Sequence, residues 1–497
     1  MRKLVILRRL SQACFLALFI YILWPTTYPL QGILPADTFF KINPFVMIFT
    51  SISGRVILPG IIFSLIMLAL TLIVGRFFCG WVCPLGTIID ACGAISKRKT
   101  KLTQSKNKTL RSIKFYILAV IAIFSFIGIQ IAWVFDPIVI TARFVSLNLI
   151  PAVTLGFDKV FIFFIRQFNF YGPLYDFYRA LKSLFLGVNV YYFSHSGIIF
   201  IFFLLIACST LLAKRFWCRA ICPLGAMYSL VARISFLRRI IEECAGCLKC
   251  KTNCRMAAIN DDLSYQKGEC ILCMDCIYDC PTHKTRFAWS LPVPPRRCNN
   301  ASQPLHLRGG TTRREFIFLM LASFLSLGLG FGKKAAVSKV IRPPGVLKEQ
   351  EFLDRCIRCG NCMKVCITNG LQPSIFECGL DGIWTPRLVP EIGYCEYQCT
   401  LCGNVCPTGA IPRLSLEEKK KTRLGVAEVD RSICLVWAHN KECLVCEEHC
   451  PVSDKAIKLT EGFKPYVDPR LCVGCGICQN KCPVRPQRAI KVSPFST

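Results

Sequence analysis

The sequence predicts an α-helical membrane domain joined to small, cysteine-rich α+β modules, and three observations lead to this fold class. The 497-residue chain is 53% hydrophobic with a mean hydropathy of +0.45, which is more apolar than an ordinary soluble protein. Its first half holds four apolar stretches long enough to cross a bilayer. The whole chain contains 33 cysteines against 5 histidines, so the cysteines are expected to carry the chemistry.

The four predicted spans are oriented by the charges of the segments between them. The spans are residues 10–30, 56–74, 115–135 and 197–213. The N-terminus, the loop 97–108 and the segment 214–239 are rich in Lys and Arg, which favour the cytoplasmic side. The N-terminus and the end of the fourth span are therefore expected inside. The aromatic-rich segment 136–196 is interpreted as outward-facing, partly interfacial structure, with a buried helix pair as the alternative.

Eight cysteines after the fourth span form two runs with the spacing C-x2-C-x2-C-x3-C. The runs are Cys244, Cys247, Cys250, Cys254 and then Cys270, Cys273, Cys276, Cys280. Bacterial two-cluster ferredoxins have this spacing: three close cysteines bind one [4Fe-4S] cluster, and the fourth binds the neighbouring cluster. On that rule Cys280 completes the first set and Cys254 the second. A zinc site would favour separated C-x2-C pairs, and disulfide frameworks belong to small secreted domains.

The C-terminal part repeats the cysteine theme four more times, which predicts ferredoxin-like 2[4Fe-4S] modules and about six clusters in the chain. The four sets are Cys356, Cys359, Cys362, Cys366; Cys395, Cys399, Cys402, Cys406; Cys434, Cys443, Cys446, Cys450; and Cys472, Cys475, Cys478, Cys482. An insertion, LVWAHNKE, stretches the third set. The fourth cysteines could be exchanged between sequential sets or in a nested pattern, and the spacing leaves both open. Five cysteines match no motif and are interpreted as small buried hydrophobes: Cys14, Cys92, Cys208, Cys298 and Cys378.

A second cysteine motif, RF-aromatic-C-x3-CPLG, occurs once after the second span and once after the fourth. Its cysteines are Cys79, Cys83, Cys218 and Cys222. If the predicted topology is right, the repeat brings four thiols to the inner membrane face. They could bind a metal centre, exchange electrons as thiol/disulfide pairs, or serve the structure. The C-x3-C spacing alone does not choose among these roles.

An apolar segment in the middle of the chain looks like a twin-arginine export signal. Arg313 and Arg314 are followed by Phe316 and an apolar run to residue 332. Since the paired arginines lie on the predicted inner side, we expect residues 313–332 to form a fifth span that carries the C-terminal part outward. Seventeen apolar residues cover only about 25 Å of a core of about 30 Å, so a short helix lying on the inner surface is the alternative.

These motifs in this order resemble a fusion of two known protein families. Residues 1–235 are similar to the NapH type of membrane quinol dehydrogenase subunit, with two C-x3-CP motifs, and residues 236–290 to its cytoplasmic 2[4Fe-4S] module. After a linker, 291–312, and the segment 313–332, residues 333–497 resemble the NapG/MauM type of periplasmic polyferredoxin. The resemblance implies a multi-pass protein of the bacterial inner membrane whose first module is cytoplasmic and whose C-terminal polyferredoxin is periplasmic.

The resemblance also implies a function: relay of electrons from the quinol pool, through the clusters, to a periplasmic oxidoreductase or electron carrier. Quinol would be the substrate. Neither G-x-G-x-x-G after a strand nor G-x4-G-K-[ST] is present, so terminal catalysis is expected in a partner. The C-x3-CP repeat is also similar to that of NosR-type and CcoG-type proteins, and the alternative is therefore an electron-donating assembly factor for a metalloenzyme. A redox sensor is a third hypothesis, but no output domain is recognisable.

The net charge of +31 does not require nucleic acid as a partner. Basic residues flank the apolar stretches, as the positive-inside rule predicts for a membrane protein. A [4Fe-4S] cluster with four thiolates also carries about −2, which lowers the charge of the loaded protein. We therefore expect lipid and quinone as partners, and no nucleic acid.

Overall fold

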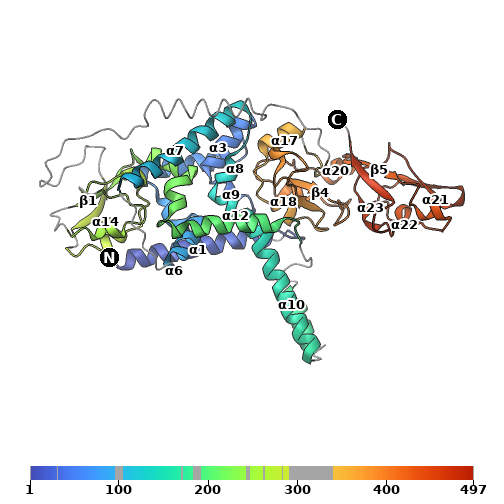
Figure 1. Ribbon diagram of the computed structural model, residues 1–497, viewed down its shortest axis with the longest axis horizontal. Helices are drawn as coiled ribbons and strands as arrows, with labels where there is room; N and C mark the ends of the chain where they lie inside the picture. Colours follow the sequence, from blue (N-terminus) through green and yellow to red (C-terminus); the bar gives the residue numbers. More distant parts are fainter. Residues whose placement is uncertain are drawn as a thin grey trace. The chain divides into compact units, whose positions relative to one another are not determined.

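The computed structural model describes residues 2–30, 32–95, 104–168, 172–182, 192–241, 247–260, 263–282, 284–289, 340–346 and 348–495 (Figure 1). Its described residues fall into two compact units. The first takes them from Met1–Tyr21, Thr38–Thr141 and Ile201–Lys333, and the second from Ile22–Asp37, Ala142–Phe200 and Lys334–Thr497. Each unit thus combines apolar helices with a cysteine-rich module, and in the second unit the module lies far from those helices in the sequence.

Three helices of the described residues are long and apolar enough to cross a membrane. They are Lys3–Leu23, Thr109–Ile127 and the 32-residue Pro137–Phe168. The first two overlap the predicted spans 10–30 and 115–135. The predicted spans 56–74 and 197–213 contain shorter helices, Ile61–Val74 and Ser196–Leu211. At about 1.5 Å per residue these are shorter than a bilayer core of about 30 Å, and the count of four spans is therefore not reproduced.

The longest helix among the described residues runs through the segment 136–196, which was predicted to be outward-facing and partly interfacial. It consists of α9 (Pro137–Phe144), a π-helical turn η1 (Val145–Leu149) and α10 (Ile150–Phe168). Pro151 has no N–H with which to continue the α-helical pattern. The π turn lies directly before it, and the Ile150 N–H already bonds to the Val145 carbonyl, five residues back. The proline is accommodated without ending the helix, because a π turn absorbs the change in hydrogen bonding.

The first unit contains most of Lys3–Leu23 and all of Thr109–Ile127, together with shorter helices and the first cysteine module. Two of its helices belong to it only in part: α1 (Arg2–Leu23) as far as Tyr21, and α12 (Ser196–Cys208) from Ile201 onward. Its other helices are α2 (Thr38–Lys41), α3 (Pro44–Ser53), α4 (Ile61–Val74), α5 (Phe77–Trp81), α6 (Pro84–Ile95), α7 (Gln104–Ile127), α8 (Ala132–Phe135), η3 (Ser209–Leu211), the π turn η4 (Trp217–Ile221) and α13 (Pro223–Ala232). The module comprises β1 (Leu237–Ile241), α14 (Lys249–Asn253), η5 (Lys267–Glu269), α15 (Asp275–Tyr278) and β2 (Thr285–Trp289). Strands β1 and β2 pair antiparallel.

The second unit contains η1, α10 and α11 (Pro173–Leu181) together with the C-terminal module. The elements of the module are α17 (Glu349–Arg355), α18 (Asn361–Lys364), β3 (Leu371–Pro373), η6 (Leu380–Gly382), β4 (Pro386–Leu388), α19 (Leu401–Asn404), α20 (Leu416–Lys421), β5 (Gly425–Val429), α21 (Leu435–His439), α22 (Val445–Glu448), β6 (Ile457–Thr460), η7 (Glu461–Phe463), β7 (Lys464–Val467), α23 (Ile477–Lys481) and β8 (Ile490–Pro494). Three antiparallel strand pairs frame it: β3 with β4, β5 with β8, and β6 with β7.

Candidate functional site

The C-terminal module contains four cavities, and each is lined by four cysteines. We name them site A (Cys356, Cys359, Cys362, Cys406), site B (Cys366, Cys395, Cys399, Cys402), site C (Cys434, Cys443, Cys446, Cys482) and site D (Cys450, Cys472, Cys475, Cys478). Three thiols of each site come from one sequence set and the fourth comes from the adjacent set. The thiols are therefore grouped by the sequential exchange rather than by the nested one.

Backbone conformation explains how the tightly spaced sets point three thiols into one cavity. In site A the residues on either side of the second cysteine, Arg358 and Gly360, have positive φ angles of 54° and 90°. Gly474 and Gly476 of site D repeat this with φ of 69° and 81°. Two left-handed residues around one cysteine reverse the chain direction twice, which brings the flanking thiols to the same side. Glycine suits such positions because it lacks the Cβ that makes them costly.

We expect Gly474→Ala to disrupt site D far more than the matched change Gly462→Ala. Both glycines have φ near +70°, so both substitutions carry the left-handed penalty of about 1–2 kcal/mol. Only at Gly474 would the new Cβ meet backbone, 2.4 Å from the Gly425 nitrogen, whereas nothing lies within 4 Å at Gly462. Iron content and the midpoint of thermal unfolding measure the difference. Equal losses in the two variants would contradict this account.

In the first module, the described residues show the position of Cys254 relative to the second set, and the exchange of Cys280 stays a prediction. Burial, with a smaller contribution from the nearby Cys254, raises the pKa of the Cys270 thiol to about 11 and that of Cys276 to about 12. Burial and Cys254 also raise the pKa of Cys273. Cys254 therefore lies with the second set, as the ferredoxin spacing predicts. Cys244 lies outside the described residues, as do Cys298 and the segment 313–332.

The RF-aromatic-C-x3-CPLG repeats bring their four cysteines together in the first unit. All four are buried. Burial is the main cause that raises the pKa of Cys83 and Cys222, and thiols of the other repeat contribute at both positions. The Sγ atoms of Cys83 and Cys222 accept hydrogen bonds from the N–H groups of Gly86 and Gly225, at 3.4 and 3.3 Å, at the starts of α6 and α13.

The arginine of each repeat lies over the glycine of the other. Arg215 donates from Nη1 to the Cys79 carbonyl at 2.9 Å, and a Cβ on Gly86 would lie 3.6 Å from its Nη2. A Cβ on Gly225 would lie 2.7 Å from Nη2 of Arg76. The crossed contacts explain why arginine and glycine recur in the motif: the glycine leaves room for the guanidinium. Two buried cations therefore lie beside the four thiols.

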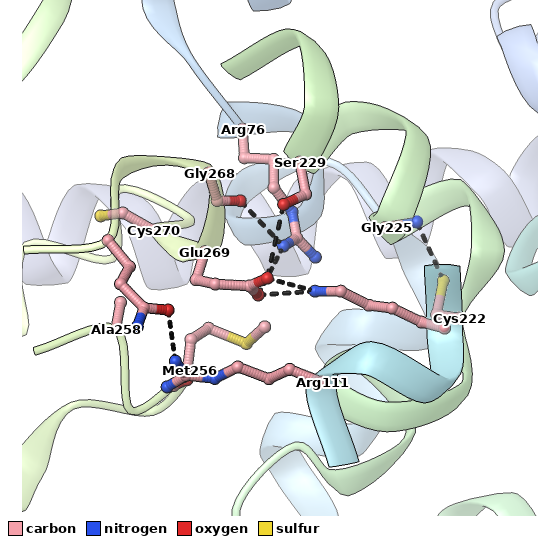
Figure 2. A network of polar contacts seen from close by, with 12 residues as sticks. Arg76, Arg111, Cys222, Gly225, Ser229, Met256, Ala258, Gly268, Glu269 and Cys270 are labelled. Atoms are coloured by element: carbon pink, nitrogen blue, oxygen red, sulfur yellow. Dashed lines mark hydrogen bonds and ion pairs between the residues drawn. The ribbon is translucent and has the colours of Figure 1, made fainter. Parts of the chain in front are cut away.

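Two buried carboxylates pair with these arginines and hold the first module against the helices, and Figure 2 shows the one at Glu269. Glu269, next to Cys270, accepts from Lys114 Nζ at 2.6 and 2.7 Å and from Arg76 Nη1 at 3.3 Å. Burial alone would raise the pKa of Glu269, but the two cations outweigh it and the pKa lies below its ordinary value. Asp90 is bound in the same way by Arg215, at 2.7 Å, and by Arg255, at 3.2 Å.

Sequence reasoning did not identify Glu269, Lys114 or Asp90. The available signal was a charged residue next to, or inside, an apolar stretch: Lys114 lies within the helix Thr109–Ile127 and is fully buried. Ionisable groups at such positions are costly and usually have a specific partner. The sequence could indicate that Lys114 needed a partner, but not that the partner stood 155 residues later.

We expect Glu269→Gln to destabilise the first unit by roughly 3–5 kcal/mol, because it leaves Lys114 and Arg76 buried without their anion. The midpoint of thermal unfolding, followed by loss of visible cluster absorbance, is the measurement. Glu442→Gln, at an exposed carboxylate, is the control and should change little. The double variant Glu269→Gln/Lys114→Met should recover part of the loss, and no recovery would contradict a charge effect.

In the second unit, the loop of site A packs against the apolar helices. A Cβ on Gly360 would lie 3.1 Å from the Leu147 side chain in η1. Arg143 of α9 donates from Nε to the Arg358 carbonyl at 2.7 Å and lies 4.3 Å over the ring of Trp384. Lys364, between Cys362 and Cys366, is fully buried and donates to the Trp24 carbonyl at 2.9 Å and to the Thr26 hydroxyl at 2.8 Å.

The cavities fit a polynuclear cluster better than a single ion. Among the described residues, no three His, Cys, Asp or Glu side chains converge closely enough to hold one metal ion. Each C-terminal cavity instead places four thiols around an otherwise mainly apolar space, such as that formed by Leu435, Val436 and Ile490 in site C. Four thiolates around one space are the donor set of a [4Fe-4S] cluster.

Comparison with known proteins agrees with this chemistry. Models described as 4Fe-4S binding domains match residues 56–103 and 196–242, which carry the C-x3-CP repeats, and residues 465–486. The ferredoxin-type protein NapG of Escherichia coli is 35% identical over 184 residues, covering 35% of this chain and 78% of that protein. The methylamine utilization ferredoxin-type protein MauM of Methylorubrum extorquens is 36% identical over 170 residues, or 32% and 74% of the two chains. No solved structure matches the chain significantly.

A third relative is longer and less similar. The putative electron transport protein YccM of Escherichia coli is 24% identical over 234 residues, covering 46% of this chain and 54% of that protein. The matches and the cysteine sets together define an iron-sulfur electron-transfer protein. The chain belongs to the NapG/MauM family of ferredoxin-type proteins, and its apolar helices agree with the predicted fusion to a NapH-like membrane part.

Proposed function

We propose that this protein relays electrons from the quinol pool, through about six [4Fe-4S] clusters, to a periplasmic oxidoreductase. The proposed ligands are the cysteines of the six ferredoxin-type sets, grouped as in sites A to D and with Cys254 and Cys280 exchanged in the first module. Each cluster would supply a one-electron carrier. Oxidation of a quinol to a quinone releases two electrons and two protons. Because each cluster accepts only one electron, the two electrons would leave the quinol one at a time.

The contact between site A and the apolar helices is the observation that carries this proposal. Gly360 and Arg358, which flank Cys359, contact Leu147 and Arg143 of the helix Pro137–Phe168. Electron transfer weakens steeply with distance, and a donor dissolved in the membrane therefore needs an acceptor at the membrane helices. Site A is in that position. The buried Lys364 fixes it there, because three backbone carbonyls and one hydroxyl accept from its ammonium group.

We propose the inner membrane as the location, with the module 236–290 in the cytoplasm and the part 333–497 in the periplasm. The basic segments around the predicted spans support this orientation. The segment 313–332, which would connect the two sides, lies outside the described residues. Reporter fusions after Cys280 are expected to read as cytoplasmic and fusions after Thr497 as periplasmic. The same readout at both points would contradict the orientation.

The alternative is an electron-donating assembly factor of the NosR or CcoG kind, and one observation favours it. The four cysteines of the C-x3-CP repeats lie together with Arg76 and Arg215 but outside the ferredoxin-type sets. Thiolates are soft ligands that favour copper(I), and a pair of these thiols would have to hold it, because no three potential ligands of the described residues converge on one ion. Copper that co-purifies in stoichiometric amount and is lost on substitution of Cys79 and Cys218 would support this reading.

Anaerobic iron and acid-labile sulfide analysis of the detergent-purified protein, with EPR before and after addition of a quinol analogue, tests the relay. About 24 irons with quinol-reducible signals are expected for six clusters. Cys359→Ala is expected to remove about four irons and the quinol-reducible signal, because Cys359 lies at the helix contact. Cys378→Ala, at a buried cysteine of no set, is the matched control. Clusters that quinol leaves oxidised would contradict the relay.

A further inference from the structure

The four C-terminal sites do not follow one another in space as they do in sequence. Sites A and B are neighbours because they exchange Cys366 and Cys406, and sites C and D because they exchange Cys450 and Cys482. The two pairs meet between B and D. The Cys395 N–H of site B donates to the Cys475 carbonyl of site D at 2.8 Å. The spatial order is therefore A, B, D, C.

Further contacts across the junction of the two pairs involve the chain segment of site D. Asn480 donates to the Pro390 carbonyl at 2.8 Å, and Gln479 donates to Glu391 at 2.8 Å. The Leu424 N–H, next to site B, donates to the Val473 carbonyl at 2.9 Å. Site A lies at one end of this order, where it contacts the apolar helices. Site C lies at the other end, as the separation of α18 and α21 in Figure 1 illustrates.

The insertion that stretches the third cysteine set builds the outer wall of site C. Residues 435–442 form α21 and its exit, and Leu435 and Val436 line the cavity. Trp437 donates from its indole N–H to the carbonyl of Pro465, which also lines the cavity, at 3.3 Å. The insertion is therefore an added helix at the end of the relay, and the departure from the usual spacing has a structural purpose.

Cations gather around site C. Arg431 and Lys464 lie over the ring of Trp437, at 4.4 and 5.1 Å. Arg485 and Arg488 both donate to the carbonyl of Cys482, a site C cysteine. Arg431, Lys441 and Arg485 are exposed. Of the nearby carboxylates, Glu447 is paired with Lys455 at 3.4 Å, while Asp430, Glu442 and Glu448 are exposed. The cations around site C exceed the carboxylates.

We infer that site C is the terminal point of electron exchange, and that a soluble redox protein with an acidic surface around its own cofactor docks there. The inference rests on the proposed function. Reduced site C would pass one electron to the oxidised partner, and no bond is formed or broken. Opposite charges accelerate such an encounter by attracting the partner over a distance, an effect that falls with ionic strength.

Stopped-flow reoxidation of the dithionite-reduced, desalted protein by two small oxidants tests the docking charge. Ferricyanide stands for an anionic partner, and hexaammineruthenium(III) is the cationic counterpart. The variant Arg431→Glu/Lys441→Glu should slow the ferricyanide reaction roughly tenfold at low salt and should not slow the ruthenium reaction. The control Lys420→Glu/Lys421→Glu carries the same charge change on α20 and should leave both rates near those of the native protein.

Iron content and the EPR spectrum of both charge variants must match those of the native protein, which excludes loss of a cluster as the cause. Equal slowing in the two charge variants, or no slowing in either, would overturn the inference. Because dithionite supplies the electrons, the result does not depend on quinol. If quinol fails to reduce the protein but the charge effect is present, quinol is contradicted as the electron donor, whereas docking at site C is supported.

The order of the sites has its own test in Cys443→Ser, which should remove about four irons and only the EPR signal of site C. The remaining clusters should still be reduced by the quinol analogue, because sites A, B and D precede site C. At low salt, reoxidation of this variant by ferricyanide should no longer be accelerated relative to reoxidation by hexaammineruthenium(III). Loss of quinol-reducible signals in this variant would place site C before the others and overturn the order.

Discussion

The exchange of fourth cysteines is the constraint on which the rest of the C-terminal module depends. No set of four consecutive cysteines completes a cavity by itself: Cys406 completes site A and Cys366 completes site B, and Cys482 and Cys450 do the same for sites C and D. Ligation would therefore tie together segments from 22 residues apart, Cys450 to Cys472, to 44 residues apart, Cys362 to Cys406. Short helices and two-stranded sheets with little core of their own suffice, because iron binding would supply folding free energy.

Charge balance performs the equivalent task in the first unit. Arg76 and Arg215 recur because each crosses to the glycine of the other repeat, and each then needs a buried anion. Glu269 and Asp90 provide it. Removing one partner from such a network leaves an uncompensated charge, which costs more than the intact pair contributes. Glu269 also directly precedes Cys270, so the network that docks the module fixes the position of a proposed ligand.

The spatial order of the sites gives the module a direction that its sequence order conceals. Site A is fixed at the apolar helices by Lys364 and the Gly360 contact with Leu147, whereas site C is surrounded by cations and enlarged by α21. A donor in the membrane and an acceptor in solution place different demands on the two ends. The apolar contact suits the first and the charged surface suits the second.

Local spacing and composition were enough to predict the cysteine chemistry, the grouping of cysteines into sets and two of the three long apolar helices. The tertiary structure decided the sequential exchange, the continuous helix through Pro151 and the partners of Lys114 and Arg215. It also decided that the third set in sequence is last in space. Each of these rests on contacts between residues far apart in the chain, which local spacing cannot encode because many long-range arrangements share the same local pattern.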